Sequence, residues 1–355
     1  MRHLPGAVLL GLGSGLVALW LGHAVPAAEP ALTATPVADV ADEIQFMNLV
    51  LTADTQGEML PCGRCKTNAG GLARRASVIA ASRDTADHML VADGGDLFLP
   101  GGPDPQVETF LIGMLAKLGY TVFGVGEADL TRGKSHLETL VAPHPGLQWV
   151  SANILDAATR QRVFKPYVLR QVGTAVVGFT SVLEPKLWQA ESAAQPGILV
   201  EPCRESLLRI MPAMRKECDL VVCFAHAQYR EVRQICADIE GLDIVVASHK
   251  ARIENYPRRI GYAKQVYFAG SRGRFINWAT VRIAAGGADP LNGRTLYLVD
   301  SIAEDSTVVR EVLAFLGTSE PPAMGEGPGG EGEEPVAPGD SGDAVPEEGV
   351  PGSPR

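Results

Sequence analysis

The sequence has few charged and aromatic residues, and this scarcity excludes several classes of protein. Charged residues make up 20% and aromatic residues 6% of the 355 residues, and no stripe of Lys and Arg runs along the chain. Nucleic-acid binding needs such a stripe to neutralise phosphates, so we expect no nucleic-acid partner. Only one long apolar run occurs, which excludes a polytopic membrane protein. Hydrophobic residues, at 46%, are plentiful enough for a well-packed core, so the chain is not wholly disordered.

The net charge of −10 is concentrated at the end of the chain. Residues 318–355 hold nine acidic residues against one Arg, together with eight Pro and nine Gly. Such a segment cannot bury enough apolar surface to offset its ordering entropy, so we predict a disordered acidic tail there. The pI of 5.3 therefore reflects this tail rather than an acidic binding face.

Residues 1–28 have the pattern of a secretory signal peptide. Arg2 and His3 precede an apolar run at residues 7–21, and small residues follow it up to Ala28. The run is shorter than the ~20 residues that cross a bilayer, so we expect cleavage near Ala28 and a periplasmic or secreted protein. Only an uncleaved segment would attach the chain to a membrane. Residues 29–43, rich in Ala, Pro and Thr, are expected to form a leader before the fold.

Export would expose the six cysteines to an oxidising compartment, where disulfides persist. The sequence alone does not decide how all six would pair. Cys62 and Cys65 have the spacing C-x-x-C, and Lys66 stands where a c-type haem would need His. This spacing suits a local disulfide. It equally suits a redox pair or a soft metal ligand, because Arg64 would favour the reactive thiolate.

The folded part is expected at residues 44–317, where short β-rich runs alternate with helical patterns. We predict helices at 70–83, 106–118, 205–216, 230–239 and 307–315, and strands at 44–52, 89–92, 121–125, 148–152, 165–170, 174–180, 220–224, 244–247, 265–269, 275–283 and 295–299. Alternation of strands and helices followed by paired strands predicts a mixed α/β fold with two sheets.

Acids or imidazoles follow five of these predicted strands, where ligands of α/β proteins gather. They are Asp54, Asp96, Glu127, His226 and His249. Carboxylates and imidazoles bind zinc, manganese and iron, so the set predicts a divalent-metal site. Each residue taken alone also suits a turn, a helix cap or a buried core position. The order of all five along the chain favours the metal site.

The segments around these residues carry a family resemblance. They read Asp54-Thr55-Gln56, Gly95-Asp96, Gly124-Val125-Gly126-Glu127, Ala225-His226 and Ser248-His249-Lys250-Ala251, and two more are Ser151-Ala152-Asn153-Ile154 and Phe164-Lys165-Pro166-Tyr167. Together they resemble the calcineurin-like metallophosphoesterases, in particular the catalytic domain of bacterial periplasmic 5′-nucleotidases. The resemblance covers about residues 44–285 and implies a four-layer α-β-β-α sandwich of two mixed sheets.

The resemblance implies hydrolysis of phosphoesters by two metal ions. However, the sequence departs from the family's motifs in the ligands of both ions. Gln56 and Ala251 stand where the family's first ion has histidines, and Val125 stands where the second ion has an Asn. We therefore expect one divalent ion rather than two, of zinc, manganese or iron. Its predicted ligands are Asp54, Asp96, His226 and His249, with Gln56 as an auxiliary ligand.

The resemblance also places the family's catalytic His, which protonates the leaving group, at Gly126. Sliding the alignment by one residue places Glu127 there instead, which makes Glu127 the candidate for that role. The leading hypothesis is a hydrolase with a small phosphorylated substrate. The alternative is a non-catalytic or thiol-redox member of the fold that uses one metal ion and the Cys62/Cys65 pair. A 5′-nucleotidase normally carries a second, base-gripping domain, and after residue 285 the sequence predicts only a strand, a helix and the tail.

Overall fold

The computed structural model describes residues 44–319, except 64, 66, 100, 103, 192–196, 250–252, 285 and 286. These residues belong to one compact unit, Asp42–Arg355, and the remaining unit is Met1–Ala41. The predicted signal peptide (1–28), the leader (29–43) and all but the first two residues of the predicted tail (318–355) lie outside the described residues. No helix in the described part of the chain is both long and apolar enough to span a membrane.

The first sheet has six strands in the order β14-β13-β1-β2-β3-β4. β1 (Gln45–Thr52), β2 (His88–Asp93), β3 (Tyr120–Gly124) and β4 (Gln148–Val150) run parallel, and β13 (Phe275–Ala284) and β14 (Gly287–Tyr297) are antiparallel at one side. The last six residues of β1 are all buried, which explains why its sequence is mostly apolar and does not alternate.

The second sheet also has six strands, in the order β11-β12-β10-β9-β7-β6. Its centre is parallel, with β7 (Ala175–Leu183), β9 (Leu220–His226), β10 (Ile244–Ser248) and β12 (Ala263–Phe268), and its edges are the antiparallel β6 (Val168–Val172) and β11 (Arg258–Ile260). A small antiparallel pair, β5 (Ile154–Asp156) and β8 (Ile198–Val200), lies apart from both sheets.

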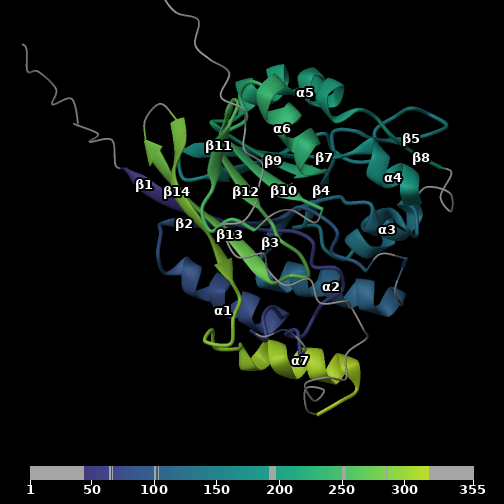
Figure 1. Ribbon diagram of the computed structural model, residues 1–355, viewed down its shortest axis with the longest axis vertical. Coiled ribbons are helices and arrows are strands. Elements are labelled where there is room, and N and C mark those ends of the chain that lie inside the picture. The colour runs from purple at the N-terminus through teal and green to yellow at the C-terminus, as the bar shows by residue number, and fades with distance from the viewer. Residues whose placement is uncertain are drawn as a thin grey trace, which may run out of the picture. The chain divides into compact units, whose positions relative to one another are not determined.

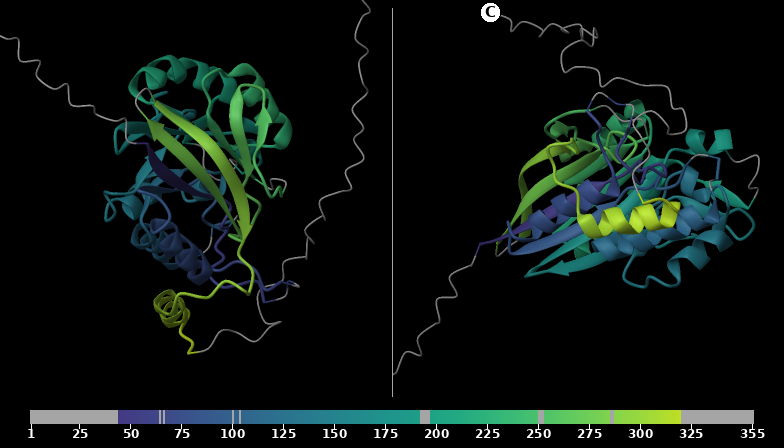
Figure 2. Two further views of the ribbon diagram at one scale, coloured as in Figure 1. Left: turned by 90° about the vertical axis from the view of Figure 1, so that its left-hand side faces the viewer. Right: turned by 90° about the horizontal axis from the view of Figure 1, so that it is seen from below.

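Three hydrophobic cores hold four layers together, and Figures 1 and 2 show the two sheets between two sets of helices. Residues of both sheets, such as Leu49 and Phe224, share the central core. One outer core lies under α1 (Leu72–Arg83), α2 (Pro105–Leu118), α3 (Lys134–Val141) and α7 (Ser306–Leu316), and it includes α4 (Pro185–Glu191). The other lies under α5 (Cys203–Glu217) and α6 (Tyr229–Asp238). This is the four-layer α-β-β-α sandwich of two mixed sheets that the resemblance implied.

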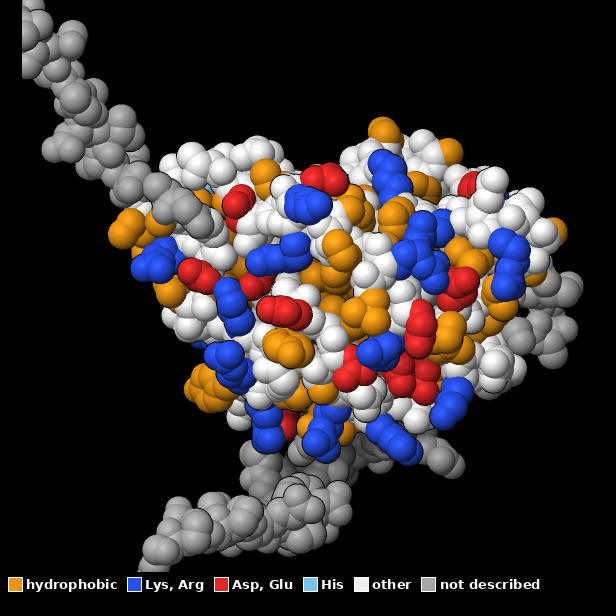
Figure 3. Space-filling model, turned by 90° about the horizontal axis from the view of Figure 1, so that it is seen from above, with side chains coloured by type: hydrophobic (Ala, Val, Ile, Leu, Met, Phe, Trp, Pro, Cys, Tyr) orange, Lys and Arg blue, Asp and Glu red, His pale blue; other side chains and the backbone are white. Residues whose placement is uncertain are grey.

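The outer face on the side of α5 and α6 carries acidic and basic side chains that alternate with apolar ones (Figure 3). One such pair joins the two helices, because Nε of Arg204 lies 2.7 Å from Oδ2 of Asp238. Opposite charges therefore neutralise each other locally on this face.

Local sequence explains where several helices begin and end. Asp104 accepts a hydrogen bond from the backbone N–H of Gln106, Pro105 opens α2, and Gly119 ends it in the left-handed conformation. α1 starts after Gly71, where a Cβ atom would lie 3.0 Å from the backbone nitrogen of Pro61. Only glycine allows the two chain segments to come this close.

The structure differs from the predicted elements at several places, among them the three-residue strands β5, β8 and β11, which were not predicted. β14 spans 11 residues, whereas only 295–299 was predicted, because this polar, Gly- and Pro-containing edge strand is mostly half-exposed and has no clear alternation. The short helices α3 and α4 were not predicted, since eight and seven residues provide little helical periodicity.

Candidate metal centre

The five predicted site residues lie at the carboxyl ends of five strands. Asp54, Asp96 and Glu127 follow β1, β2 and β3, which are parallel neighbours in the first sheet. His226 is the last residue of β9 and His249 follows β10 directly, and these two strands are parallel neighbours in the second sheet. The backbone N–H of His249 donates to Oδ2 of Asp54 at 2.8 Å, which joins the ends of the two sheets.

Four of the five side chains form one cluster. Asp96, Glu127, His226 and His249 each offer a ligand atom, and these atoms all lie within 4.8 Å of one another. Oε2 of Glu127 is 2.6 Å from Nε2 of His226, and Oε1 of Glu127 is 2.7 Å from Nδ1 of His249. Oδ2 of Asp96 lies 3.5 Å from Nε2 of His226. Two carboxylates and two imidazoles thus face a common point.

The hydrogen bonding of this cluster is incomplete. Nε2 of His226 and Oε2 of Glu127 are both buried and lie 2.6 Å apart as an ion pair, and neither has a further hydrogen-bond partner. Oδ1 of Asp54 is a third buried atom without a hydrogen-bond partner. Buried polar atoms almost always have partners, and an ion is one of the few explanations for a group of exceptions. The set of nitrogen and oxygen donors fits a divalent cation such as zinc, manganese or iron.

Surrounding residues fix the orientation of the cluster. The Oγ atom of Ser248 lies 2.9 Å from Nδ1 of His226, which leaves Nε2 facing the carboxylates. The carboxylate of Asp129 accepts backbone N–H groups of Asp96, Leu97 and Gly126 at 2.8–3.0 Å and so joins the loops after β2 and β3. These roles of Ser248 and Asp129 could not be predicted from the sequence, because no local pattern marks them.

The backbone around the centre is held in an uncommon conformation. Asp54, Asp96 and His249 have φ values of 52°, 51° and 65°, in the left-handed region. Non-glycine residues rarely adopt such values, although Asp and His do so more often than most. Strained backbone of this kind is concentrated at functional sites, where the surrounding structure holds it in place.

Burial and charge shift the pKa values of the cluster in opposite directions. Burial alone would raise the pKa of Glu127, but the two imidazoles outweigh burial and hold it below its usual value. Burial alone would lower the pKa of His226, but the carboxylates of Asp96 and Glu127 outweigh burial and hold it well above its usual value. Burial raises the pKa of Asp96 to about 6, against the opposing charge of His226. The cluster therefore favours a positive charge at its centre.

The segment after β3 differs in how its three residues, Val125, Gly126 and Glu127, relate to the cluster. Val125, aligned with the family's metal-binding Asn, is fully buried in the hydrophobic core. A Cβ atom on Gly126, aligned with the catalytic His, would lie 2.1 Å from Oδ1 of Asp96, so no larger residue fits there. Glu127 reaches the cluster instead. Its carboxylate lies between the two imidazoles of His226 and His249.

The remaining predicted site residues lie around the cluster or outside the described residues. Asp54 is adjacent, with Oδ1 3.8 Å from Nδ1 of His226. The backbone N–H of Gln56 donates to the carbonyl of Asp96 at 2.9 Å, which places this residue beside the centre. Lys250 and Ala251, as well as Arg64 and Lys66 of the C-x-x-C segment, lie outside the described residues.

Cys62 and Cys65 are joined by a disulfide bond. The other four cysteines, Cys203, Cys218, Cys223 and Cys236, are free and buried. Burial raises the pKa of the Cys218 thiol to about 11 and that of the Cys236 thiol to about 12. These buried thiols are therefore poor nucleophiles.

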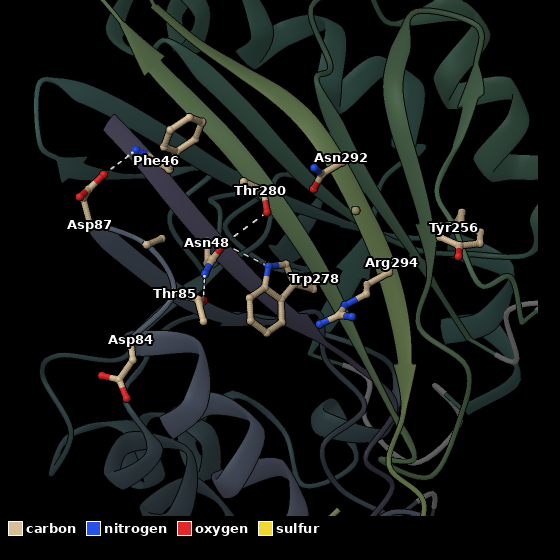
Figure 4. Close-up of a pocket in the computed structure, with 12 residues that line it drawn as sticks. Phe46, Asn48, Asp84, Thr85, Asp87, Tyr256, Trp278, Thr280, Asn292 and Arg294 are labelled. Atoms are coloured by element: carbon tan, nitrogen blue, oxygen red, sulfur yellow. Dashed lines mark hydrogen bonds between the residues drawn. The ribbon is translucent and has the colours of Figure 1, made fainter. Parts of the chain in front are cut away.

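A separate cleft of about 940 Å³ lies at the other end of β1 (Figure 4). Its wall includes Asn48, Trp278 and Arg294, and the Arg294 guanidinium lies 5.3 Å from the centre of the Trp278 ring. Strands rise about 3.3 Å per residue, so Asn48 lies roughly 20 Å along the chain from Asp54. The cleft and the candidate metal centre are distinct regions.

Comparison with proteins of known structure identifies the fold. The sulfate thiohydrolase SoxB of Thermus thermophilus matches with a TM-score of 0.67 at 16% identity, over 76% of this chain and 60% of its own. The calcineurin-like phosphoesterase YfkN of Bacillus subtilis matches with a TM-score of 0.64 at 18% identity, over 77% of this chain and 97% of its own. The chain therefore has the fold of the calcineurin-like metallophosphoesterases.

Within that fold, the resemblance to 5′-nucleotidases is confirmed. A 5′-nucleotidase precursor of Thermus thermophilus has a TM-score of 0.64 at 21% identity, over 77% of this chain and 58% of its own. By sequence, the chain is 24% identical over 277 residues to the snake venom 5′-nucleotidase of Gloydius brevicauda. The match covers 68% of this chain and 45% of that protein.

A second sequence relative has a related activity. The 2′,3′-cyclic-nucleotide 2′-phosphodiesterase/3′-nucleotidase of Salmonella typhimurium is 24% identical over 237 residues, or 57% of this chain and 36% of that protein. The matched part thus spans a third to a half of the length of these curated relatives. No family model matches the sequence.

Proposed function

We propose that this chain is an exported, metal-dependent phosphoester hydrolase that acts on a small phosphorylated substrate. One observation carries the proposal. Four ligand atoms lie within 4.8 Å of one another, and two of the facing atoms are buried as an ion pair without a further hydrogen-bond partner. The nucleotidase and phosphodiesterase relatives support it, because their named reactions are hydrolyses of phosphoesters.

The proposed centre holds one ion through Asp96, Glu127, His226 and His249. A divalent ion polarises a phosphoryl oxygen and lowers the pKa of bound water, which are the two requirements of phosphoester hydrolysis. The chain fixes the donors in advance, because Ser248 orients the ring of His226 and Asp54 holds the backbone of His249. A second ion would have Asp54 as a ligand, but Gln56 and Ala251 occupy the positions of its two histidines. The dinuclear site of the family is therefore incomplete in this proposal.

The proposed enzyme has no histidine to protonate the leaving group. Gly126 has no room for a side chain, and Glu127 is held between two imidazoles. A substrate whose leaving group departs without a proton loses little from this absence. We therefore propose that activated esters, such as aryl phosphates, are better substrates than alkyl phosphates such as nucleoside monophosphates.

Export is proposed from the sequence of residues 1–28. The short apolar run and the small residues after it support removal of the leader near Ala28. The intact mass of protein recovered from the exported fraction tests this directly. A mass that still includes Met1 would contradict cleavage.

The decisive test of the hydrolase proposal combines metal content with turnover. Purified mature protein would be loaded with zinc, manganese or iron and assayed with p-nitrophenyl phosphate. The Asp96→Asn variant keeps the size of the side chain but removes its charge, and we expect it to lose both bound metal and turnover. His144→Gln, which changes a histidine away from the cluster, is the matched control. No metal-dependent turnover with any of the three ions would refute the proposed function.

A further inference from the structure

The Cys62–Cys65 disulfide has a cation beside it. Nη2 of Arg274 donates to Sγ of Cys62 at 3.6 Å, and both cysteines are partly exposed. Arg274 is 212 positions away in the sequence, so no sequence motif indicates this contact. None of the proposed metal ligands contacts the pair among the described interactions.

The disulfide contributes little to holding its own loop. Backbone hydrogen bonds already close the loop, from Cys62 N–H to the carbonyl of Ala69 at 2.8 Å and from Asn68 N–H to the carbonyl of Cys65 at 3.1 Å. An isolated antiparallel β-bridge between Pro61 and Gly70 holds the two ends of the loop together. The sequence separation of the cysteines is 3, and the entropic stabilisation from a disulfide is smallest for the shortest loops. A purely structural role would therefore gain little from this bond.

Arg274 differs from its neighbour Arg272 in its partners. Arg272 pairs with Glu58 at 3.4 Å. In the described part of the chain, no carboxylate lies within ion-pair distance of Arg274, and its guanidinium contacts the Cys62 sulfur. Burial lowers the pKa of Arg274, and the charges of Tyr297 and Glu58 oppose this effect only in part. A thiolate at Cys62 would place an anion in direct contact with the guanidinium.

We propose that Cys62 and Cys65 form a redox-active pair that exchanges with an external dithiol, with Cys62 as the sulfur that leaves as thiolate beside Arg274. A thiolate of the dithiol attacks Sγ of Cys65, the bond between the two cysteines breaks, and its electron pair stays on Cys62. The second thiol of the dithiol then attacks the mixed disulfide and releases Cys65. The protein disulfide gains two electrons and two protons, and the dithiol loses them as it becomes a disulfide.

Other charged and titratable groups also lie near the Cys62–Cys65 pair. Arg272 and Glu58 pair with each other, and the Tyr297 hydroxyl lies 2.8 Å from Oγ1 of Thr67 in the same loop. The other four cysteines are buried, and their burial excludes external thiols. The pair is therefore the only described cysteine site at which exchange with an external dithiol is expected.

The first experiment measures whether the pair is reducible in the folded protein. The metal-free full chain would be incubated with dithiothreitol under native conditions and trapped with iodoacetamide. We expect mass spectrometry to show two labels, on Cys62 and Cys65, and none on the four buried cysteines. A pair that stays oxidised until the protein unfolds would overturn the proposal.

The second experiment tests the role of Arg274. A single charge-assisted contact favours a thiolate about tenfold, since about 1.4 kcal/mol corresponds to a factor of ten. In the reduced protein, Arg274→Gln should move the pH of half-maximal Cys62 alkylation up by about one unit, while the matched control Arg272→Gln leaves it unchanged. Arg274→Lys, which keeps the charge, should recover part of the shift. Equal midpoints in all four proteins would show that Arg274 does not stabilise the thiolate.

Discussion

The two ends of β1 handle buried polar groups in opposite ways. At the amino end, the side chain of Asn48 is completely paired. It donates to Oγ1 of Thr85 at 2.7 Å and accepts from Nε1 of Trp278 at 3.1 Å. At the carboxyl end, Oδ1 of Asp54 is buried without a hydrogen-bond partner, and Oε2 of Glu127 and Nε2 of His226 are buried with only each other as partner, at 2.6 Å.

This difference distinguishes a structural network from a binding centre. A buried donor or acceptor left unpaired costs about 1–3 kcal/mol, so a cluster of such atoms is destabilising unless something binds there. At the amino end, the hydrogen bonds of Asn48 are made within the protein, and they stabilise the junction of α1 with the first sheet. The carboxyl end gathers donors whose chemistry fits a divalent cation. The volume of the cleft at the amino end of β1 is therefore a poorer guide to function than the buried polar atoms at the carboxyl end.

The largest effect is expected in substrate preference at the carboxyl end. General-acid assistance is typically worth about 10²–10⁴-fold, and in the proposed centre both histidines are metal ligands and do not provide it. The rate of metal-dependent hydrolysis should therefore favour p-nitrophenyl phosphate over AMP by a factor in this range. Steady-state assays of both substrates would measure the ratio, with Asp96→Asn as the background. Comparable rates would mean that another group, such as Glu127, protonates the leaving group.

Metal affinity should fall with substitutions at the carboxyl end of β1 and stay unchanged with substitutions at the amino end. Removing one of four donors with His249→Ala should weaken binding at least tenfold, or about 1.4 kcal/mol, because each donor contributes directly to the ion's coordination. Asn48→Ala is the control at the other end and should leave affinity unchanged. Calorimetric titration of zinc or manganese into the metal-free proteins measures both. Equal affinity in His249→Ala and the parent would mean that His249 is only a core residue.

Introducing the family's histidine at Gly126 should harm rather than help. The new Cβ atom would clash with Oδ1 of Asp96 at 2.1 Å, and overpacking of this kind costs about 1–3 kcal/mol. We expect Gly126→His to unfold at lower urea concentration and to bind less metal. Gly113→Ala, in α2 with open space around its Cβ position, should instead stabilise by about 0.5–1 kcal/mol. A stable, metal-replete and faster Gly126→His variant would contradict the steric argument.

The smallest effect is expected at the amino end. Trp278→Phe removes the N–H that donates to Asn48, and one net hydrogen bond is worth about 1 kcal/mol. Urea denaturation should show a loss of about this size, with metal affinity unchanged. Tyr256→Phe, at a residue that is 70% exposed, should change neither. A change in metal affinity in Trp278→Phe would show that the two ends of β1 are coupled.

Much of the fold could be predicted from the sequence because its strands are continuous apolar runs. The predicted strand at 44–52 corresponds to β1, and the predicted helix at 106–118 corresponds to α2 within one residue. Their local hydrophobic patterns and capping residues determine these elements. β14 could not be predicted in full, because its pairing with β13 comes from the sheet rather than from its own polar sequence.

The candidate site was partly predictable for the same reason. Residues that directly follow an apolar run lie at a strand end, so Asp54, Asp96, His226 and His249 could be selected from the sequence alone. Glu127 was selected in the same way, but its role was not, because motif alignment near β3 is ambiguous by one residue. Close packing of Gly126 against Asp96 decides which side chain reaches the centre.

The sequence by itself determined the strand order along the chain, the residues at the strand ends and the spacing of the Cys62–Cys65 pair, all of which depend on neighbouring residues. Only the tertiary structure decided that Glu127 lies between two imidazoles and that Arg274 contacts Cys62. The physical reason is that such contacts join residues distant in sequence, whose approach depends on how two sheets pack across a shared core.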